Sequence, residues 1–202
     1  MRHRARPENF FDDHELWQWQ ETWRDYLRDN EPDPHLIIFM VDKTGNVGKS
    51  EFVGHAQSLI PNKIVFTMAP RDVQSMSSLI PDDGADVILI DAPRQVQYDL
   101  PYSFIEECKN GFVTNTKYEV SQKQFKTPHL LIFMNRMPRF GSSILSADRY
   151  IIVELELTPE EQQKRDSVQV TGRHELLESY MERTQEIREE AFEMYKSMNE
   201  SN

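Results

Sequence analysis

The sequence contains a single cysteine, Cys108, among 202 residues. One cysteine cannot close a disulfide within the chain or build a cysteine-based zinc cluster, so a reducing compartment is expected. No run of 18 consecutive apolar residues is present, so the sequence predicts no transmembrane helix. The basic N-terminus, MRHRARPENFF, lacks the apolar segment of a secretory signal. We therefore expect the protein in the cytoplasm or nucleus.

Positive charge is also scarce. The 23 Lys and Arg residues face 34 Asp and Glu residues, which gives a formal net charge of −11 and a pI of about 5.0. This balance excludes a protein that coats DNA through its overall charge. A ring of identical subunits can still concentrate a few lysines at one pore. The hydrophobic content of 38% is sufficient for a core, and the length suggests one domain, or one domain with helical additions.

Residues 37–52, IIFMVDKTGNVGKSEF, carry the most specific pattern. Five apolar residues predict a buried strand, a turn-rich loop follows, and GKS opens a segment that is expected to be helical. This is the layout of a phosphate-binding loop, whose backbone N–H groups bind anionic oxygens. Lys49 would meet the β- and γ-phosphates, and Ser50 would ligate Mg²⁺. The expected nucleotide contacts are Gly45, Asn46, Val47, Gly48, Lys49 and Ser50.

The loop departs from the usual pattern at one position. Lys43 stands where G-x-x-x-x-G-K-[ST] has its first glycine. Gly45 and Asn46 tolerate positive φ, so they can make the turn instead. The alternative interpretation is a plain turn before a surface helix.

The order of predicted elements indicates an α/β fold with a mainly parallel central sheet. Strands are expected over 37–41, 63–68, 85–91 and 129–134, with one more within 145–157. Helices are expected over 12–27, 51–59, 71–79, 102–108 and 174–198. The first of these has Asp12 and Glu15 at capping-box spacing and a Trp-bearing face that would pack on the core or on a neighbouring subunit.

Ligands of parallel sheets bind at the carboxyl ends of the strands. Asp91 and the phosphate-binding loop are both expected at such ends, and Asp91 would supply a second Mg²⁺ contact. Asn135 follows the strand 129–134 and could bind the γ-phosphate or the attacking water. The alternatives are a carboxylate that merely ends a strand and an asparagine in a turn.

Residues 109–126 are locally basic and contain aromatic residues, in a segment expected to form a hairpin or loops. Lysines beside aromatic rings can follow a nucleic-acid backbone and stack on bases. The candidate contacts are Lys109, Lys117 and Tyr118. An ordinary solvated loop is the competing interpretation.

Six segments occur in the order of a known family: ELWQWQETW, DKTGNVGKS, VILIDAPR, KNGFVTNTKY, PHLLIFMNRMP and LSADRYIIVEL. Over residues 15–157 the chain resembles the superfamily 3 helicase domain of the replication (Rep) proteins of circular single-stranded DNA viruses and related plasmids. The resemblance implies an AAA+-like P-loop NTPase core. It also implies a hexameric, ATP- and Mg²⁺-dependent helicase that acts on single-stranded DNA in rolling-circle replication inside a host cell.

On this resemblance, Lys49, Ser50, Asp91 and Asn135 match three helicase motifs, and Arg149 is our choice for an arginine finger that reaches a neighbouring subunit. Ala92 replaces a second acid that many relatives carry, so the catalytic base is undefined. Residues 1–35 are too short for the family's nuclease domain, and neither His3 nor His14 lies in its metal motif. No nicking or joining activity is expected.

The expected organisation is an N-terminal helical segment over 1–34 that could promote oligomerisation, an NTPase core over 35–157 and a C-terminal helix over 158–202. Two other functions remain open. One is a catalytically weak nucleotide-binding oligomerisation module, which Lys43 and Ala92 favour, and the other is a small P-loop kinase. Single-stranded RNA is the alternative to single-stranded DNA as the substrate.

Overall fold

The computed structural model describes residues 16–70, 72–94, 100–115, 121–138 and 145–171. The elements in chain order are α1 (Gln18–Asp29), β1 (Ile37–Val41), α2 (Lys49–Leu59), β2 (Val65–Met68), α3 (Val73–Leu79), β3 (Val87–Asp91), α4 (Tyr102–Lys109), β4 (Phe112–Asn115), β5 (Ser121–Gln124), β6 (His129–Met134), the 3₁₀ turn η1 (Ala147–Arg149), β7 (Tyr150–Glu154) and α5 (Pro159–Thr171). The chain divides into two compact units, residues 1–157 and 158–202. Only α5 of the second unit is described.

A five-stranded sheet in the order β2-β3-β6-β1-β7 forms the centre of the first unit. All four strand pairs are parallel, and Ile37 lies opposite Leu130 on one side and Tyr150 on the other. The carboxyl ends of β1, β3 and β6 therefore reach the same edge. The sheet confirms the predicted α/β P-loop NTPase fold, and β1 and β6 have the predicted bounds.

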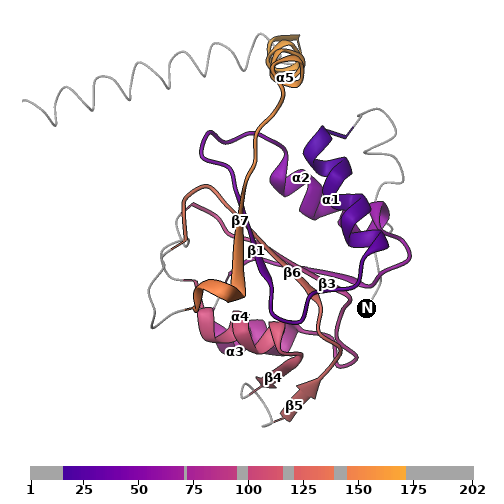
Figure 1. Ribbon diagram of the computed structural model, residues 1–202, viewed down its shortest axis with the longest axis vertical. Coiled ribbons are helices and arrows are strands. Elements are labelled where there is room, and N and C mark those ends of the chain that lie inside the picture. The colour runs from indigo at the N-terminus through magenta and orange to yellow at the C-terminus, as the bar shows by residue number, and fades with distance from the viewer. Residues whose placement is uncertain (1–15, 71, 95–99, 116–120, 139–144, 172–202) are drawn as a thin grey trace, which may run out of the picture. The chain divides into compact units, whose positions relative to one another are not determined.

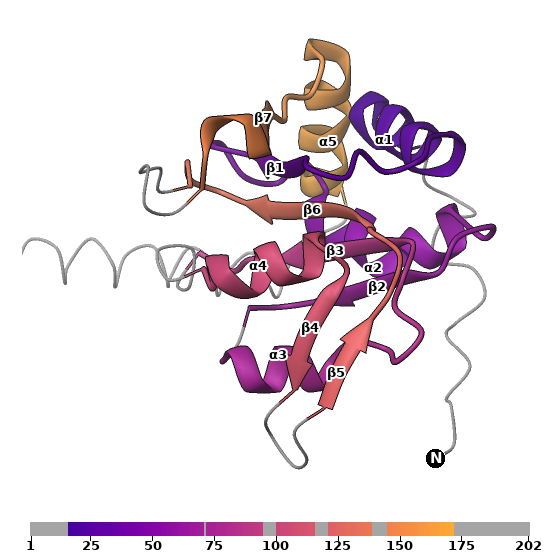
Figure 2. The ribbon, with the colours of Figure 1, turned by 60° about the horizontal axis from the view of Figure 1, so that its bottom comes forward.

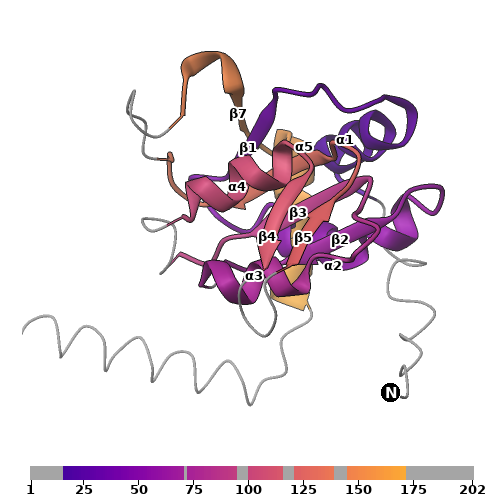
Figure 3. The same ribbon diagram turned by 90° about the horizontal axis from the view of Figure 1, so that it is seen from below.

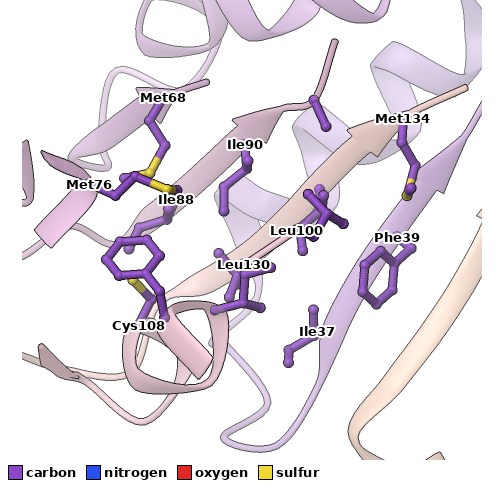
Figure 4. Packing of buried hydrophobic residues seen from close by; sticks show 14 of the residues in the cluster. Ile37, Phe39, Met68, Met76, Ile88, Ile90, Leu100, Cys108, Leu130 and Met134 are labelled. Carbon is purple, nitrogen blue, oxygen red and sulfur yellow. The ribbon is translucent and has the colours of Figure 1, made fainter. Parts of the chain in front are cut away.

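Helices cover both faces of this sheet (Figure 1), with α1 and α2 on one side and α3 and α4 on the other. Neighbouring residues of a strand point to opposite faces. Accordingly, Ile37 and Phe39 enter the core under α3 and α4, whereas Ile38 and Met40 enter the core under α1 and α2. Figure 4 shows the first of these clusters, in which Ile37 and Leu130 lie on adjacent strands. Burial on both faces explains why the central strands are continuously apolar.

The N-terminal helix begins later than the sequence predicted. Residues 1–15 lie outside the described part, but Leu16 and Trp17 are not helical and α1 starts at Gln18. The reason is the Gln20 side chain, whose Oε1 accepts a hydrogen bond from the Trp17 N–H at 2.9 Å and so fixes the first turn. Trp19 is 8% exposed and packs against the Phe52 ring. The interpretation of this face as core packing is therefore confirmed.

Strands β4 and β5 form an antiparallel hairpin, and β4 packs against α3 and α4 (Figure 2; Figure 3). Lys109, proposed above as a nucleic-acid contact, is 1% exposed, and its Nζ donates to the Pro128 carbonyl at 2.8 Å. Burial lowers the pKa of Lys109 to about 8. A buried ammonium cannot meet a phosphate backbone, so the prediction was wrong for this residue. Lys117 and Tyr118 lie outside the described residues.

The remaining elements follow the sequence with small shifts of their ends. The predicted helix over 174–198 lies outside the described residues, and α5 was not predicted as a separate element. None of the described helices combines the length and the apolar character that crossing a bilayer requires.

Candidate nucleotide-binding site

A pocket of about 350 Å³ opens at the carboxyl ends of β1, β3 and β6. The loop after β1, the first turn of α2 and the segments that follow β3 and β6 supply its walls. The pocket is lined by Asn46, Gly48, Lys49, Ser50, Glu51, Asp91, Ala92, Pro93, Arg94 and Asn135. The fold thus brings Lys49, Ser50, Asp91 and Asn135 together, as the order of predicted strands required.

The loop between β1 and α2 turns by left-handed backbone conformations. Gly45, Asn46 and Gly48 have φ values of 86°, 66° and 84°. This confirms that Gly45 and Asn46 replace the missing first glycine, while Lys43 points away and pairs with Glu154 at 2.8 Å. Gly45 and Val47 do not line the pocket. The Gly45 N–H donates to Asp42, and Val47 is buried at 2% exposure.

Lys49 is held by a buried carboxylate that the sequence did not single out. Its Nζ lies 2.6 Å from Asp42 Oδ2, and the two side chains are 9% and 0% exposed. Burial by itself would raise the pKa of Asp42, but hydrogen bonds from Lys49 and the Gly45 N–H hold that pKa below its ordinary value. The Asp42 carboxylate is therefore charged at neutral pH. An anion that binds Lys49 must therefore compete with the Asp42 carboxylate for the ammonium group.

Ser50 and Asp91 supply the oxygen atoms that suit Mg²⁺. Both line the pocket; Ser50 is exposed in the first turn of α2, and Asp91 is half-buried at the end of β3. Within the described ranges, no group of three or more His, Cys, Asp or Glu side chains could hold a metal alone. Mg²⁺ with nucleotides commonly uses only one or two protein ligands beside phosphate oxygens and water. The donor set fits that arrangement.

Asn135 links the ends of two adjacent strands. Its Nδ2 donates to the Asp42 carbonyl oxygen at 3.0 Å, and the Asp42 N–H donates to the Met134 carbonyl oxygen at 2.9 Å. Asn135 is thus joined to the backbone of the residue whose carboxylate holds Lys49. A displacement of Lys49 can therefore be passed to Asn135 through Asp42, and the reverse also holds.

Two side chains of helix α1 bind the backbone of the loop between β1 and α2. Trp19 Nε1 donates to the Val47 carbonyl at 2.9 Å, and Gln20 Nε2 donates to the Gly48 carbonyl at 3.1 Å. A Cβ on Gly48 would lie 2.8 Å from that Gln20 nitrogen and 3.2 Å from the Trp17 ring. Glycine at position 48 therefore permits both the left-handed turn and the close approach of α1. The N-terminal helix is a structural support of the loop.

Replacing Gln20 by alanine is expected to loosen the loop without opening the sheet. The change removes the bond to Gly48 and the cap on Trp17, which together should cost about 1–2 kcal/mol. Amide exchange of residues 46–50 should accelerate, while exchange in β1 and β6 stays slow. Glu21→Gln, an exposed change on the same helical turn, is the matched control. Equal exchange rates in the loops of Gln20→Ala and Glu21→Gln would contradict the bracing role.

Arg149 lies at the amino end of β7, whereas the pocket lies at the carboxyl ends of the strands. Its Nη2 donates to Asn110 Oδ1 at 2.8 Å, and its Nη1 lies 3.4 Å from Glu106. Within one subunit Arg149 is apart from the pocket, so any catalytic role must be toward a neighbour.

Sequence reasoning missed three charged residues of the site: Asp42, Glu51 and Arg94. Each was visible beside a motif. Asp42 follows β1 directly, Glu51 follows the GKS tripeptide, and Arg94 follows Asp91 by three residues. Their side-chain directions depend on loop geometry, which strand and helix periodicity does not specify.

No protein-family model matches this chain. The chain is similar to the Para-Rep C6 protein of Subterranean clover stunt C6 alphasatellite, with 32% identity over 143 residues, 69% of this chain and 48% of that protein. The master replication protein of Subterranean clover stunt virus (strain F) is 28% identical over 142 residues, 69% of this chain and 47% of that protein. The chain spans about half the length of the curated relatives it matches.

Among solved structures, the apo form of the C-terminal region of NrS-1 aligns with a TM-score of 0.43 and 12% identity over 74% of this chain and 38% of that chain. This likeness is too distant to bear on the function.

Proposed function

We propose that this Rep-related domain hydrolyses ATP in order to move along single-stranded DNA during rolling-circle replication. The relatives that match this chain are Para-Rep and master replication proteins, and this similarity supports a role in replication. The ATP-driven helicase activity is our inference from the site. It concerns the matched domain, because the chain spans only about half of those relatives.

The observation that carries the proposal is the meeting of Lys49, Ser50, Asp91 and Asn135 at one pocket, although they come from segments far apart in the sequence. Lys49 lines the pocket from the first turn of α2 and would bind the β- and γ-phosphates. Ser50 and Asp91 would hold Mg²⁺, which neutralises charge on the phosphate oxygens. Asn135 would orient the attacking water or the γ-phosphate.

Binding of ATP requires Lys49 to exchange a carboxylate for phosphate oxygens. The Asp42 carboxylate remains beside it, with its second oxygen still bonded to the Gly45 N–H and to Thr44. A buried carboxylate that retains donors does not become an uncompensated charge when Lys49 moves a short way. The pair can therefore keep Lys49 ordered before the nucleotide arrives.

Assembly and DNA contact complete the proposal. We propose a homo-oligomer, with six subunits in a ring, in which Arg149 of one subunit reaches the nucleotide of the next. Lys117 and Tyr118 remain the proposed contacts to single-stranded DNA. Replacing Lys117 by alanine should reduce the slope of log affinity against log salt by about 0.7, since one phosphate contact is lost.

The test is the rate of ATP hydrolysis with and without single-stranded DNA, at an oligomeric state verified by sedimentation. We expect Mg²⁺-dependent hydrolysis that rises when single-stranded DNA is added and falls away in EDTA. A matched single-stranded RNA distinguishes the two substrates. Hydrolysis that is absent under all these conditions would contradict the proposal.

A catalytically weak nucleotide-binding module is the second candidate, and Ala92 is the observation that favours it. Ala92 is 2% exposed and lines the pocket directly after Asp91, where an acid could orient water. Such a module would bind ATP, assemble, and release almost no phosphate. Binding without turnover in verified oligomers would favour it over the helicase.

A further inference from the structure

Arg94, the last residue of the segment VILIDAPR, lies at the pocket but is not among the contacts expected from the sequence. It follows β3 by three residues and lines the pocket with Lys49 and Ser50. A Cβ built on Gly45 would lie 2.8 Å from Arg94 Nη2, so the guanidinium lies directly over the loop. The absence of a side chain at Gly45 therefore leaves the space that this guanidinium occupies.

The donors of Arg94 are not engaged by the protein. Within the described residues, Arg94 has no hydrogen bond or ion pair, whereas Lys49 in the same pocket is bonded to Asp42. The pocket also contains the carboxylates of Glu51 and Asp91. Without Arg94, the formal charge of the residues that line the pocket would be negative, and this charge would disfavour binding of a polyphosphate. An exposed, unpaired guanidinium thus supplies the positive charge that a phosphate group would meet first.

We propose that Arg94 binds the terminal phosphate of a nucleoside triphosphate in the same subunit, and so distinguishes a triphosphate from a diphosphate. This inference rests on the proposed function of the pocket. The planar guanidinium presents paired N–H groups that match two phosphate oxygens, which a lysine cannot do. The loop would surround the inner phosphates and Lys49 would reach the β- and γ-phosphates. Arg94 lines the pocket beside Asp91, where the γ-phosphate and its Mg²⁺ would lie. Unlike Arg149, Arg94 needs no neighbouring subunit.

The experiment compares the affinities of ATP and ADP, each with Mg²⁺, by titration calorimetry on the full chain at one verified oligomeric state. The variants are Arg94→Ala and Arg94→Lys, with Arg28→Ala as the matched arginine control. Arg28 lies at the far end of α1 and pairs with Asp25 and Asp29. Arg94→Ala should weaken ATP about tenfold, the effect of losing a charge-assisted hydrogen bond. ADP affinity should change less than about twofold, and Arg94→Lys should retain part of the ATP affinity.

Two results would overturn the inference. One is unchanged ATP affinity in folded Arg94→Ala, and the other is an equal loss for ATP and ADP. Suppose that Lys49→Ala lowers the affinity for ATP in the same experiment. Either result then rules out the proposed role of Arg94 and leaves the proposed function of the pocket standing. If the wild-type chain binds neither nucleotide, the proposed function fails and the role of Arg94 fails with it.

Discussion

Replacing Lys49 by alanine is expected to abolish ATP hydrolysis and also to lower the free energy of unfolding by about 3 kcal/mol. The loss of activity follows from the removal of the ammonium that we propose binds the phosphates. The loss of stability follows from Asp42, which is fully buried and would keep its charge without its partner. Replacing a surface lysine would cost less than about 0.5 kcal/mol. The larger loss expected here comes from the burial of Lys49 beside Asp42. Urea unfolding and phosphate release measure the two effects.

Two further variants separate stability from activity. Lys49→Ala combined with Asp42→Asn should recover most of the stability but none of the hydrolysis, because the uncompensated charge is gone. Lys43→Ala changes the other lysine of the loop, which is exposed and paired with Glu154. It should cost less than about 0.5 kcal/mol and leave hydrolysis intact. A Lys49→Ala protein as stable as Lys43→Ala would show that the buried pair contributes nothing.

The pH dependence gives an independent check. In the wild type the pKa of Asp42 is lowered in the folded state, so its stabilising effect is present above about pH 4 and is lost as the pH falls through the folded value. In Lys49→Ala the main hydrogen bond that lowers this pKa is absent, and burial should raise it above the ordinary value. The stability deficit of the variant should therefore shrink as the pH is lowered from 7 toward 4.

Replacing Arg149 by alanine is expected to reduce hydrolysis about 10³-fold or more in assembled rings, the effect of losing an arginine finger. Affinity for ATP should change much less. Mixing Arg149→Ala subunits with Lys49→Ala/Asp42→Asn subunits should restore part of the activity, because some interfaces then join an intact loop to an intact finger. Sedimentation must verify that mixed rings form. Absence of recovery in verified mixed rings would rule out the action in trans.

The contacts of Arg149 within its own subunit require a control. Nη1 contacts Glu106 of α4, and Nη2 contacts Asn110, the residue that follows this helix. The alanine variant therefore also removes a structural contact. Glu106→Gln weakens that contact while keeping the guanidinium. If Glu106→Gln reduces hydrolysis as strongly as Arg149→Ala, the arginine is a structural support of η1 and not a finger.

The sequence predicted the parts of the molecule that depend on local pattern. Apolar runs located β1 and β6 to the residue, and the glycine and asparagine of the loop indicated where φ becomes positive. Strand order then brought Asp91 and Asn135 to Lys49, because parallel strands align their carboxyl ends.

The contacts that escaped prediction are those between distant side chains. Lys109 looked like a solvated residue of a basic segment. It is instead buried at the end of α4, where the Pro128 carbonyl oxygen accepts a hydrogen bond from its Nζ. Gln20 looked like one polar residue of an amphipathic helix, yet it binds a loop 28 positions away. Periodicity assigns a residue to one face of its helix or strand. It does not specify which hydrogen-bonding groups the segment packed against that face presents.

The position of β1 in the sheet has a consequence for how the protein folds. Its two neighbours, β6 and β7, are among the last strands in the sequence, and β1 pairs with neither β2 nor β3. Closing such distant pairs slows folding, because chain entropy is lost before the contacts form. While the chain is being synthesised, the strand that leads into the loop has no partner in the sheet until residue 129 emerges. The loop is encoded early, but it acquires its shape among the last parts of the core.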